Sequence, residues 1–175
     1  MTVLGRTASV LDCAGHVAQQ PPVWAAIAAV LAVVPGARSR RAALRGAVCY
    51  GTTAVIANLV VKPIVRRDRP PEAGRGRIGP LTSSFPSGHA ATDVAFVFGV
   101  TQELPVLFLP LGAMALAAHW SLVRTRGHYA GDVLFGGVLG IGVVLAIRKV
   151  WPSARSPGRS GADFSGRHRD RDLSL

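Results

Sequence analysis

The sequence predicts an all-α protein, a polytopic membrane helical bundle of about five transmembrane helices. Three observations support this fold class. Hydrophobic residues make up 49% of the 175 residues, and charged residues only 17%. The apolar residues fall in blocks about as long as a bilayer is thick. Ala, Gly, Val and Leu dominate these blocks, and such small residues allow spanning helices to pack closely.

Two segments flank the predicted membrane domain, which covers residues 21–151. Residues 1–20 place apolar side chains partly on one helical face, a pattern that fits both an interfacial helix and a frayed terminus. Residues 152–175 consist mainly of Ser, Gly, Arg and Asp, which predicts a disordered basic tail. The chain does not open with a charged start, an apolar core and a cleavage site, so we expect no secretory signal peptide.

Five apolar blocks give the predicted spanning helices. The first, from about Pro21 to Ala37, is the weakest because prolines limit both of its ends. The second runs from about Ala42 to Val61 and ends where a lysine and a proline interrupt the apolar pattern. The remaining blocks run from about Ser87 to Thr101, from Leu104 to Val123 and from Ala130 to Ile147.

The longest connection, residues 64–86, is rich in Arg, Pro and Gly. Long loops in compact proteins are usually either functional or disordered. This one has one motif at its start and another at its end, so we expect it to be functional. Because the fourth helix returns the chain to the side of this loop, the motifs at 62–70, 86–89 and 128–132 should meet at one membrane face.

The formal net charge of +11 does not predict nucleic-acid binding. The basic residues lie between apolar blocks and in the tail, and no DNA- or RNA-binding motif accompanies them. Anchoring by anionic membrane lipids explains most of them. The two cysteines, Cys13 and Cys49, provide neither a disulfide framework nor a zinc pattern. We therefore expect membrane lipids as partners, no nucleic acid, no metal and no cofactor, while an oligomer is compatible with the sequence.

The segment Pro86–His89 leads into the third apolar block. Ser87 is a good helix N-cap, and Gly88 lets the backbone approach a ligand closely. The free N–H groups at a helix start favour a phosphate, toward which His89 would project. Alone, the pattern favours an ordinary N-cap with a surface histidine. Asp93, one turn later, could face the site or pair with an arginine.

His128 and Asp132 stand four residues apart at the start of the fifth block. On a helix this spacing would stack them on one face. The carboxylate could then accept a hydrogen bond from one ring nitrogen, leaving the other free to attack. A His–Asp pair that merely caps a helix is the alternative. Acids are rare in or beside the apolar blocks, and such residues are usually functional, which favours the first interpretation.

Basic residues flank both histidine motifs. They are Lys62, Arg66, Arg67, Arg69, Arg124 and Arg126. A stop-transfer cluster would explain the first four alone, but six cations around two histidines favour an oxyanion-binding site. Cations can hold a phosphate while one histidine attacks phosphorus and the other protonates the leaving oxygen. The set predicts cleavage of a phosphate ester without a metal.

In this order and spacing the motifs resemble those of the type 2 phosphatidic acid phosphatase superfamily, which also includes bacterial class A acid phosphatases and vanadium haloperoxidases. The family signature is K-x6-R-P, then P-S-G-H, then S-R-x5-H-x3-D. The matching residues are Lys62, Arg69 and Pro70, then Pro86 to His89, then Ser121, His128 and Asp132. The chain departs from the signature at Leu122, which replaces the arginine of the third motif. The resemblance covers roughly residues 42–147, with about five spans where six are common.

The resemblance implies roles for these residues. His128 would be the nucleophile that forms a phosphohistidine, Asp132 would orient it, and His89 would be the general acid for the leaving oxygen. The phosphate-binding residues would be Lys62, Arg69, Ser87 and Gly88, with Arg124 or Arg126 standing in for the arginine replaced by Leu122. Loss of one such contact could cost about 2–4 kcal/mol of transition-state stabilisation.

The resemblance and a site at the bilayer surface favour an integral membrane phosphatase for a lipid-linked phosphate monoester or diphosphate. The family's range suggests polyprenyl diphosphates, polyprenyl-phosphate sugars, phosphatidic acid or phosphatidylglycerol phosphate. Abundant Ala, Arg, Gly and Val are typical of a GC-rich bacterium such as an actinobacterium. Compact relatives there resemble the phosphatase for decaprenylphosphoryl-phosphoribose, which implies a role in cell-wall precursor synthesis.

Two other functions remain alternatives. The departure at Leu122 motivates a catalytically weak lipid-phosphate-binding membrane protein or partner subunit. A vanadate-dependent haloperoxidase is disfavoured because those relatives are soluble and larger.

Basic residues also predict the orientation in the membrane. With five spans, the connection at residues 38–45 and the tail from Arg148 lie on the same side, and both are basic. Positive charge favours the cytoplasmic side. We therefore expect a protein of the bacterial cell membrane whose active site faces outward.

Overall fold

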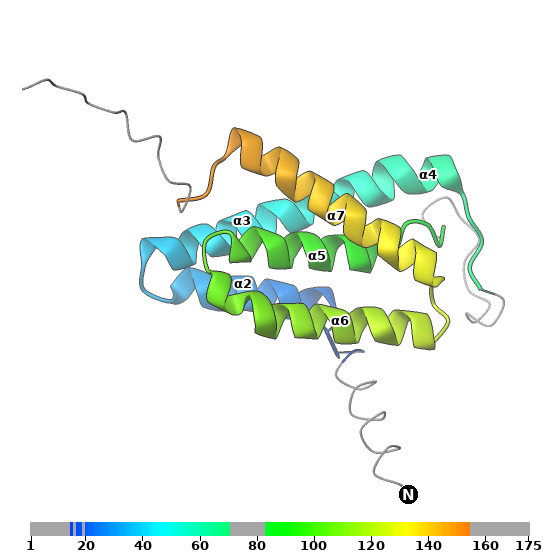
Figure 1. Ribbon diagram of the computed structural model, residues 1–175, viewed down its shortest axis with the longest axis horizontal. Coiled ribbons are helices and arrows are strands. Elements are labelled where there is room, and N and C mark those ends of the chain that lie inside the picture. The colour runs from blue at the N-terminus through cyan, green and yellow to red at the C-terminus, as the bar shows by residue number, and fades with distance from the viewer. Residues whose placement is uncertain (1–14, 16, 19, 71–82, 155–175) are drawn as a thin grey trace, which may run out of the picture.

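The computed structural model describes residues 15, 17, 18, 20–70 and 83–154. All regular elements within these residues are helices, which confirms the all-α class. The helices follow each other back and forth along one axis, as Figure 1 shows. Of the predicted N-terminal segment, only residues 15, 17, 18 and 20 are described, and the predicted tail beyond residue 154 lies outside the description.

After residue 20, the described residues form five helical segments, in the predicted order. The first is α2 (Pro21–Val33). The second is continuous and consists of α3 (Ala37–Val55), the π-helical η1 (Ile56–Val61) and α4 (Lys62–Val65). The others are α5 (Gly88–Thr101), the 3-10 turn η3 (Pro105–Leu107) leading into α6 (Phe108–Arg124), and α7 (Ala130–Val150).

Three of these segments are long and apolar enough to cross a membrane: Ala37–Val65, Pro105–Arg124 and Ala130–Val150. The first and third predicted spans are shorter. Helix α2 is apolar but has 13 residues, about 20 Å of helix against a hydrocarbon core of about 30 Å. Helix α5 has 14 residues, most of them buried. The second predicted span begins earlier and ends later than its apolar pattern, at Ala37 and Val65.

Helix α5 forms the centre of the bundle, with α3, α6 and α7 packed around it (Figure 1). Its approach to α7 depends on two glycines of α7. A Cβ atom at Gly136 would overlap the backbone oxygen of Ser87, and one at Gly140 would overlap that of Ala91. The backbones therefore touch where α5 begins, which fixes the start of α5 against α7.

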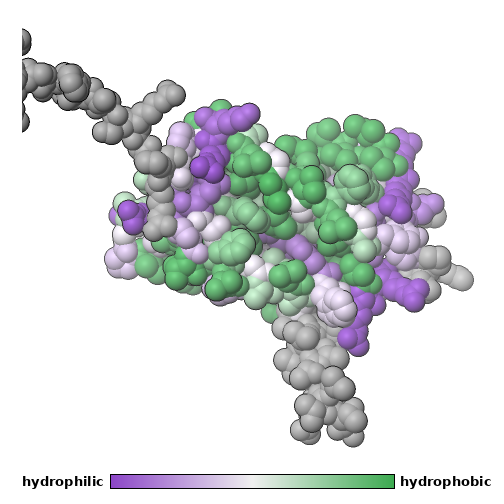
Figure 2. Space-filling view, viewed as in Figure 1, coloured by the Kyte–Doolittle hydropathy of each residue, from purple (hydrophilic) through white to green (hydrophobic). Residues whose placement is uncertain are grey.

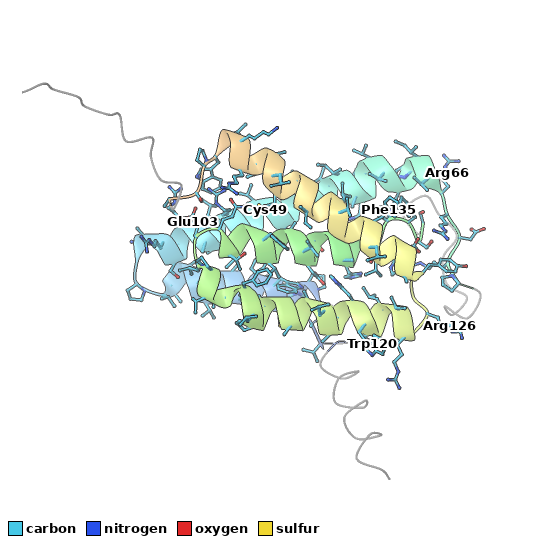
Figure 3. All side chains as sticks on the ribbon, viewed as in Figure 1. Cys49, Arg66, Glu103, Trp120, Arg126 and Phe135 are labelled. Carbon is cyan, nitrogen blue, oxygen red and sulfur yellow. The ribbon has the colours of Figure 1, made fainter. Side chains whose placement is uncertain are left out.

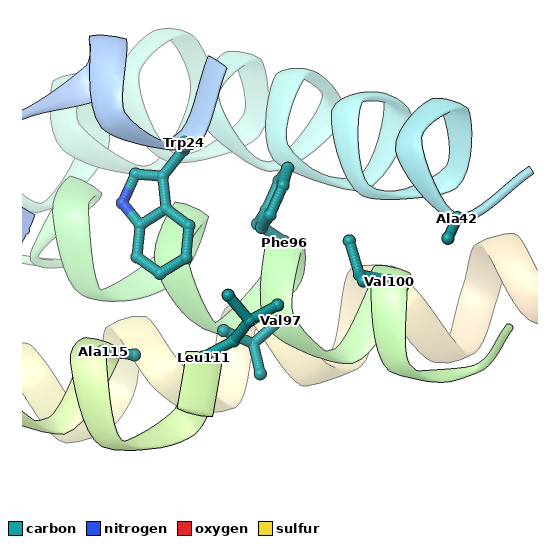
Figure 4. Packing of buried hydrophobic residues seen from close by; sticks show 7 residues of the cluster. All are labelled: Trp24, Ala42, Phe96, Val97, Val100, Leu111 and Ala115. Atoms are coloured by element: carbon teal, nitrogen blue, oxygen red, sulfur yellow. The ribbon is translucent and has the colours of Figure 1, made fainter. Parts of the chain in front are cut away.

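The main hydrophobic cluster lies between α2, α3, α5 and α6 (Figure 4). Trp24 of α2 meets Phe96 of α5 with ring centroids 5.2 Å apart. Val97 and Val100 continue this face of α5, and Leu111 contributes from α6. Apolar burial of this kind joins the short helix α2 to the longer helices.

The face shown in Figure 2 is mostly apolar around its middle and more hydrophilic toward both ends. Large hydrophobic residues on the long helices face outward, including Leu109, Leu116, Leu134 and Val138. An apolar surface of this extent is stable in lipid rather than in water. The molecule therefore has the form of an integral membrane protein.

A buried ion pair closes the end of the bundle where α3 begins. The Arg45 Nε donates to Glu103 Oε1 at 3.1 Å, and both side chains are fully buried. The Arg45 guanidinium also lies 4.5 Å from the ring centroid of Trp151 and donates to the Pro152 oxygen at 3.0 Å. Ala154 N donates to Glu103 Oε2 at 3.2 Å. Residues 152–154, predicted to begin the tail, are thus bonded to the bundle.

Candidate active site

The three predicted motifs come together at the end of the bundle opposite Glu103. Here α4 ends, α5 begins and the connection from α6 to α7 passes between them (Figure 1). The Arg69 Nη1 of the first motif donates to the Gly127 oxygen beside the third at 3.1 Å. The backbone N–H of Ser87, in the second motif, donates to the backbone oxygen of Asp132, in the third, at 3.0 Å. The expected convergence on one face is thereby present in the fold.

Lys62 is positioned by the π-helical turn η1, which precedes it. The apolar pattern predicts that the second helix stops here because Pro63 lacks an N–H. The helix instead continues, because the wider π turn before the proline accommodates its missing donor. The buried Lys62 Nζ donates to Asn58 Oδ1 at 2.7 Å, and Asn58 Nδ2 donates to the Ala54 oxygen at 2.9 Å. A polar residue of the membrane segment thus holds the lysine.

The start of α5 lies against this lysine. Ser87 is the N-cap, and its side chain accepts from Ala90 N, as predicted. A Cβ atom added to Gly88 would come within 3.3 Å of Asn58 Oδ1 and 3.4 Å of Lys62 Nζ. Glycine therefore allows the lysine to approach the first turn of the helix, where N–H groups and the positive dipole end point outward. His89, the next residue, is exposed at this end.

His128 is placed differently from the expectation. It precedes α7, whose N-cap is Tyr129, so it does not share a helical face with Asp132. Its Nδ1 lies 2.8 Å from the Ser84 oxygen and 4.0 Å from Asp132 Oδ2. The ring nitrogen therefore hydrogen-bonds to a backbone carbonyl and not to the predicted carboxylate. A carbonyl only accepts, so Nδ1 carries the hydrogen and Nε2 keeps its lone pair.

The Asp132 carboxylate does not bond to His128 and instead connects the first and third motifs. Its side chain is fully buried, and its Oδ1 accepts from Arg67 Nη1 at 3.0 Å. Its Oδ2 accepts from Tyr129 N at 3.1 Å, which forms a capping box at the start of α7. The Arg67 guanidinium also lies 4.6 Å from the centre of the Tyr129 ring. The carboxylate thus ties the segment after α4 to the start of α7.

The charges around His128 favour its neutral form. Burial and then the Arg69 cation lower the pKa of His128 to about 4, with a smaller contribution of the same sign from His89. The Ser84 carbonyl and Asp132 raise this pKa and are outweighed. A neutral imidazole at physiological pH is what a nucleophilic histidine requires.

The remaining predicted cations lie at the rim of the site. Arg69, Arg124 and Arg126 are all exposed at this end of the molecule, and Arg126 has a left-handed backbone with φ of 54°. Figure 3 places Arg66 and Arg126 at this end and Glu103 at the other. Leu122 is buried against Ala90 and Val133, below the first turn of α5. The position of the missing arginine is therefore filled by apolar packing.

Asp93 faces the interior of the bundle. Its Oδ2 lies 3.8 Å from His119 Nε2, with Trp24 and Thr92 beside it. Neither carboxylate oxygen has a hydrogen-bond partner among the residues described. Of the two predicted alternatives, it neither joins the cluster around His128 nor pairs with an arginine in that part of the chain. No group of three or more His, Cys, Asp or Glu side chains that could hold a metal occurs within the described ranges.

Two residues of the site were not predicted, and a third was predicted only as a member of the basic cluster. Asn58 is a polar residue inside an apolar block, a signal that the sequence does carry. Arg67 belongs to the basic cluster, but its sequence position does not distinguish it from Arg66. Ser84 acts through its backbone carbonyl, which no sequence motif can reveal.

Comparison with known proteins agrees with this architecture. The family model described as the PAP2 superfamily matches residues 43–156. A solved structure with a similar fold is the transmembrane PAP2 type phosphatidylglycerolphosphate phosphatase from Bacillus subtilis, with a TM-score of 0.59 and 23% sequence identity. The match covers 81% of this chain and 75% of that chain. No curated protein sequence shows a significant match.

Proposed function

The chain belongs to the PAP2 superfamily, and from this membership and the geometry of the site we propose that it is an integral membrane phosphatase. Its substrate would be a lipid-linked phosphate monoester or diphosphate. One observation carries the proposal. His128, with its Nδ1 bonded to a carbonyl, shares one end of an apolar bundle with Lys62 and the N-terminus of α5.

The first step transfers the phosphoryl group to the protein. Lys62, the N–H groups at Gly88 and the Arg69 side chain hold the phosphate oxygens and stabilise the charge that develops on them. The lone pair of His128 Nε2 forms a bond to phosphorus while the bond to the leaving oxygen breaks. His89 gives its proton to that oxygen, and a phosphohistidine remains.

The second step returns the protein to its starting state. Water attacks the phosphorus of the phosphohistidine, and His89 takes up the proton of that water. The bond between phosphorus and Nε2 breaks, so inorganic phosphate leaves and His128 is neutral again. The proton that His89 gave in the first step is restored, so the cycle needs no further proton donor.

The position of the site supports a lipid substrate. The cations lie at the end of the bundle, where an apolar surface meets a polar rim (Figure 2). A lipid can keep its tail in the membrane while its phosphate reaches that end. Polyprenyl and phospholipid phosphates fit this requirement, and a cell-wall precursor such as decaprenylphosphoryl-phosphoribose belongs to the same class. The basic connection at the opposite end supports an outward-facing site in a bacterial cell membrane.

A panel of lipid phosphates tests the proposal. Purified protein in nanodiscs is given polyprenyl phosphate, polyprenyl diphosphate, phosphatidic acid or phosphatidylglycerol phosphate, and released phosphate is measured. We expect release from at least one of these lipids and its loss in His128→Ala. An alkaline quench with radiolabelled substrate should trap an acid-labile phosphoprotein in the wild type but not in this variant. Release that persists in His128→Ala would overturn the proposed mechanism.

Leu122 gives the second candidate function, a catalytically weak protein that binds lipid phosphates. The arginine of the family signature is replaced here by a side chain buried in an apolar cluster. Leu122→Arg separates the two functions. An active phosphatase should lose stability and gain no activity, because the new cation would be buried among apolar groups. A gain of tenfold or more in phosphate release would instead favour the weak binder.

A further inference from the structure

The segment after α4 is bonded to the segment before α5, close to the nucleophile. Ser84 N donates to the Arg67 oxygen at 2.8 Å, and Arg67 N donates to Ser83 Oγ at 2.9 Å. Ser84 Oγ donates to the Asp68 oxygen at 2.9 Å. Ser83 and Ser84 are both buried. We call these four residues, Arg67, Asp68, Ser83 and Ser84, the loop junction.

The loop junction reaches the His128–Asp132 pair twice. The Ser84 carbonyl accepts from His128 Nδ1 at 2.8 Å, and Arg67 Nη1 donates to Asp132 Oδ1 at 3.0 Å. The first contact is made by backbone and fixes the tautomer of the ring. The second is made by a side chain and compensates a carboxylate that has no exposure to solvent.

We propose that Arg67 is a positioning residue for the nucleophile, a role that rests on the proposed phosphatase function. Its guanidinium neutralises Asp132, and its backbone holds Ser84 in place. Arg67 lies outside the conserved letters of the family signature, within the x6 stretch between Lys62 and Arg69. It does not need to touch the substrate for this role.

The charges around His128 show how Arg67 affects it. The ring is faced by Asp132 from α7, by His89 from α5 and by Arg69 from the segment after α4. The Ser84 carbonyl contacts Nδ1 directly. Of these groups Asp132 carries the negative charge, 4.0 Å from Nδ1, and Arg67 is ion-paired with it. Without the Arg67 cation, the buried carboxylate attracts a proton to the imidazole more strongly.

An ordinary surface ion pair would not have this effect. The Arg67 side chain is 48% exposed, but its partner is fully buried and lies beside the predicted nucleophile. Removing one partner of such a pair leaves an uncompensated buried charge. The expected consequence is therefore a change at His128, not merely a change in stability.

The test compares Arg67→Gln with Arg148→Gln, which removes an exposed arginine at the far end of α7. Histidine-labelled protein in nanodiscs is titrated by NMR, with the His128 signal identified by its loss in His128→Gln. We expect a higher titration midpoint for His128 in Arg67→Gln and an unchanged one in Arg148→Gln. In Asp132→Asn protein, Arg67→Gln should produce no further shift, because the neutral amide leaves no buried charge for Arg67 to compensate.

Kinetics supply the second readout. We expect kcat of Arg67→Gln to fall by about 10- to 100-fold with KM within threefold of the wild type, as for a misplaced catalytic group. Arg67→Lys keeps the charge and should restore the NMR midpoint while recovering only part of kcat. If Arg67→Gln does not fold, Arg67→Lys still tests the side-chain geometry at constant charge, and Ser83→Ala tests the backbone contact.

Each outcome bears on one of the two proposals. An unchanged His128 midpoint in a folded Arg67→Gln protein would overturn the role of Arg67. So would a kcat within twofold of the wild type in a variant that remains active. A shifted midpoint in a protein that releases phosphate from no lipid would confirm the effect of Arg67 on His128 and overturn the phosphatase proposal.

Discussion

His128 is held so that its two ring nitrogens have separate tasks. Nδ1 donates to the carbonyl of Ser84, which leaves the lone pair of Nε2 for the proposed attack on phosphorus. Asp132, the acid of the same motif, lies too far from Nδ1 for a direct hydrogen bond and acts through its charge and its bonds to Arg67 and Tyr129. The residues expected at this position are present, but the contacts between them differ from those that spacing alone indicates.

The low pKa of His128 predicts how activity depends on pH. With this pKa at about 4, the imidazole is neutral and reactive above that value and is lost as a nucleophile below it. The acid limb of kcat/KM should therefore fall about tenfold per pH unit below about 4, since kcat/KM reports groups of the free enzyme.

Phosphate release measured between pH 3 and 7, corrected for ionisation of the substrate, checks this expectation. An inactive variant such as His128→Ala serves as the background. An acid limb centred near 6.5, the value of an ordinary exposed histidine, would show that the site does not depress the ionisation of His128.

The helices show which features of the fold could be predicted from the sequence. The order of the apolar blocks gave the five helical segments, because a membrane requires apolar side chains along a spanning helix. The predicted end of the second helix, at Val61, was wrong, because a π turn lets the helix continue past Lys62. The central position of α5 depends on glycines of α7 that meet it only in the folded bundle. Such contacts between distant segments have no local signal.

The contact between α5 and α7 leads to a prediction about glycines. A Cβ atom at Gly140 would overlap the Ala91 oxygen, whereas one at Gly142 has open space. Gly140→Ala should therefore force α7 away from α5 and destabilise the protein by about 1–3 kcal/mol. Gly142→Ala, on the same helix, should be neutral or slightly stabilising, because alanine is the better helix former.

Thermal unfolding in detergent, followed by the loss of helical circular dichroism, compares these two variants. The expected order of melting temperatures is Gly140→Ala below the wild type and Gly142→Ala equal to it or above it. Equal melting temperatures for both variants would mean that the two helices are not packed as closely as described.

The whole molecule is polarised between its two ends. One end gathers the predicted catalytic residues, and the other holds the Arg45–Glu103 ion pair together with Trp151. The family and the helical membrane fold could be anticipated from three short motifs and the apolar blocks, because both depend on residue type and order. The orientation in the membrane is inferred only from a modest difference in positive charge between the two ends of the bundle, so it remains a prediction.

Cysteine labelling tests the orientation of the whole molecule. In a background with Cys13→Ala and Cys49→Ala, single cysteines replace Arg66 at the site end or Arg38 at the opposite end, both exposed positions. A membrane-impermeant maleimide added to intact cells or spheroplasts should label Arg66→Cys and not Arg38→Cys. Labelling of Arg38→Cys alone would place the site in the cytoplasm, and disrupted membranes serve as the control for reactivity.

The closed end of the bundle has a consequence for the fate of the product. Arg45 and Glu103 are fully buried there, and the aromatic and aliphatic core of Trp24, Phe96 and Val100 fills the space behind the site. Within the described residues, these groups fill the interior of the bundle between its two ends. On the proposed function, a phosphate released at the site would return to the compartment from which the headgroup entered, and reuse of the lipid would require a separate movement between leaflets.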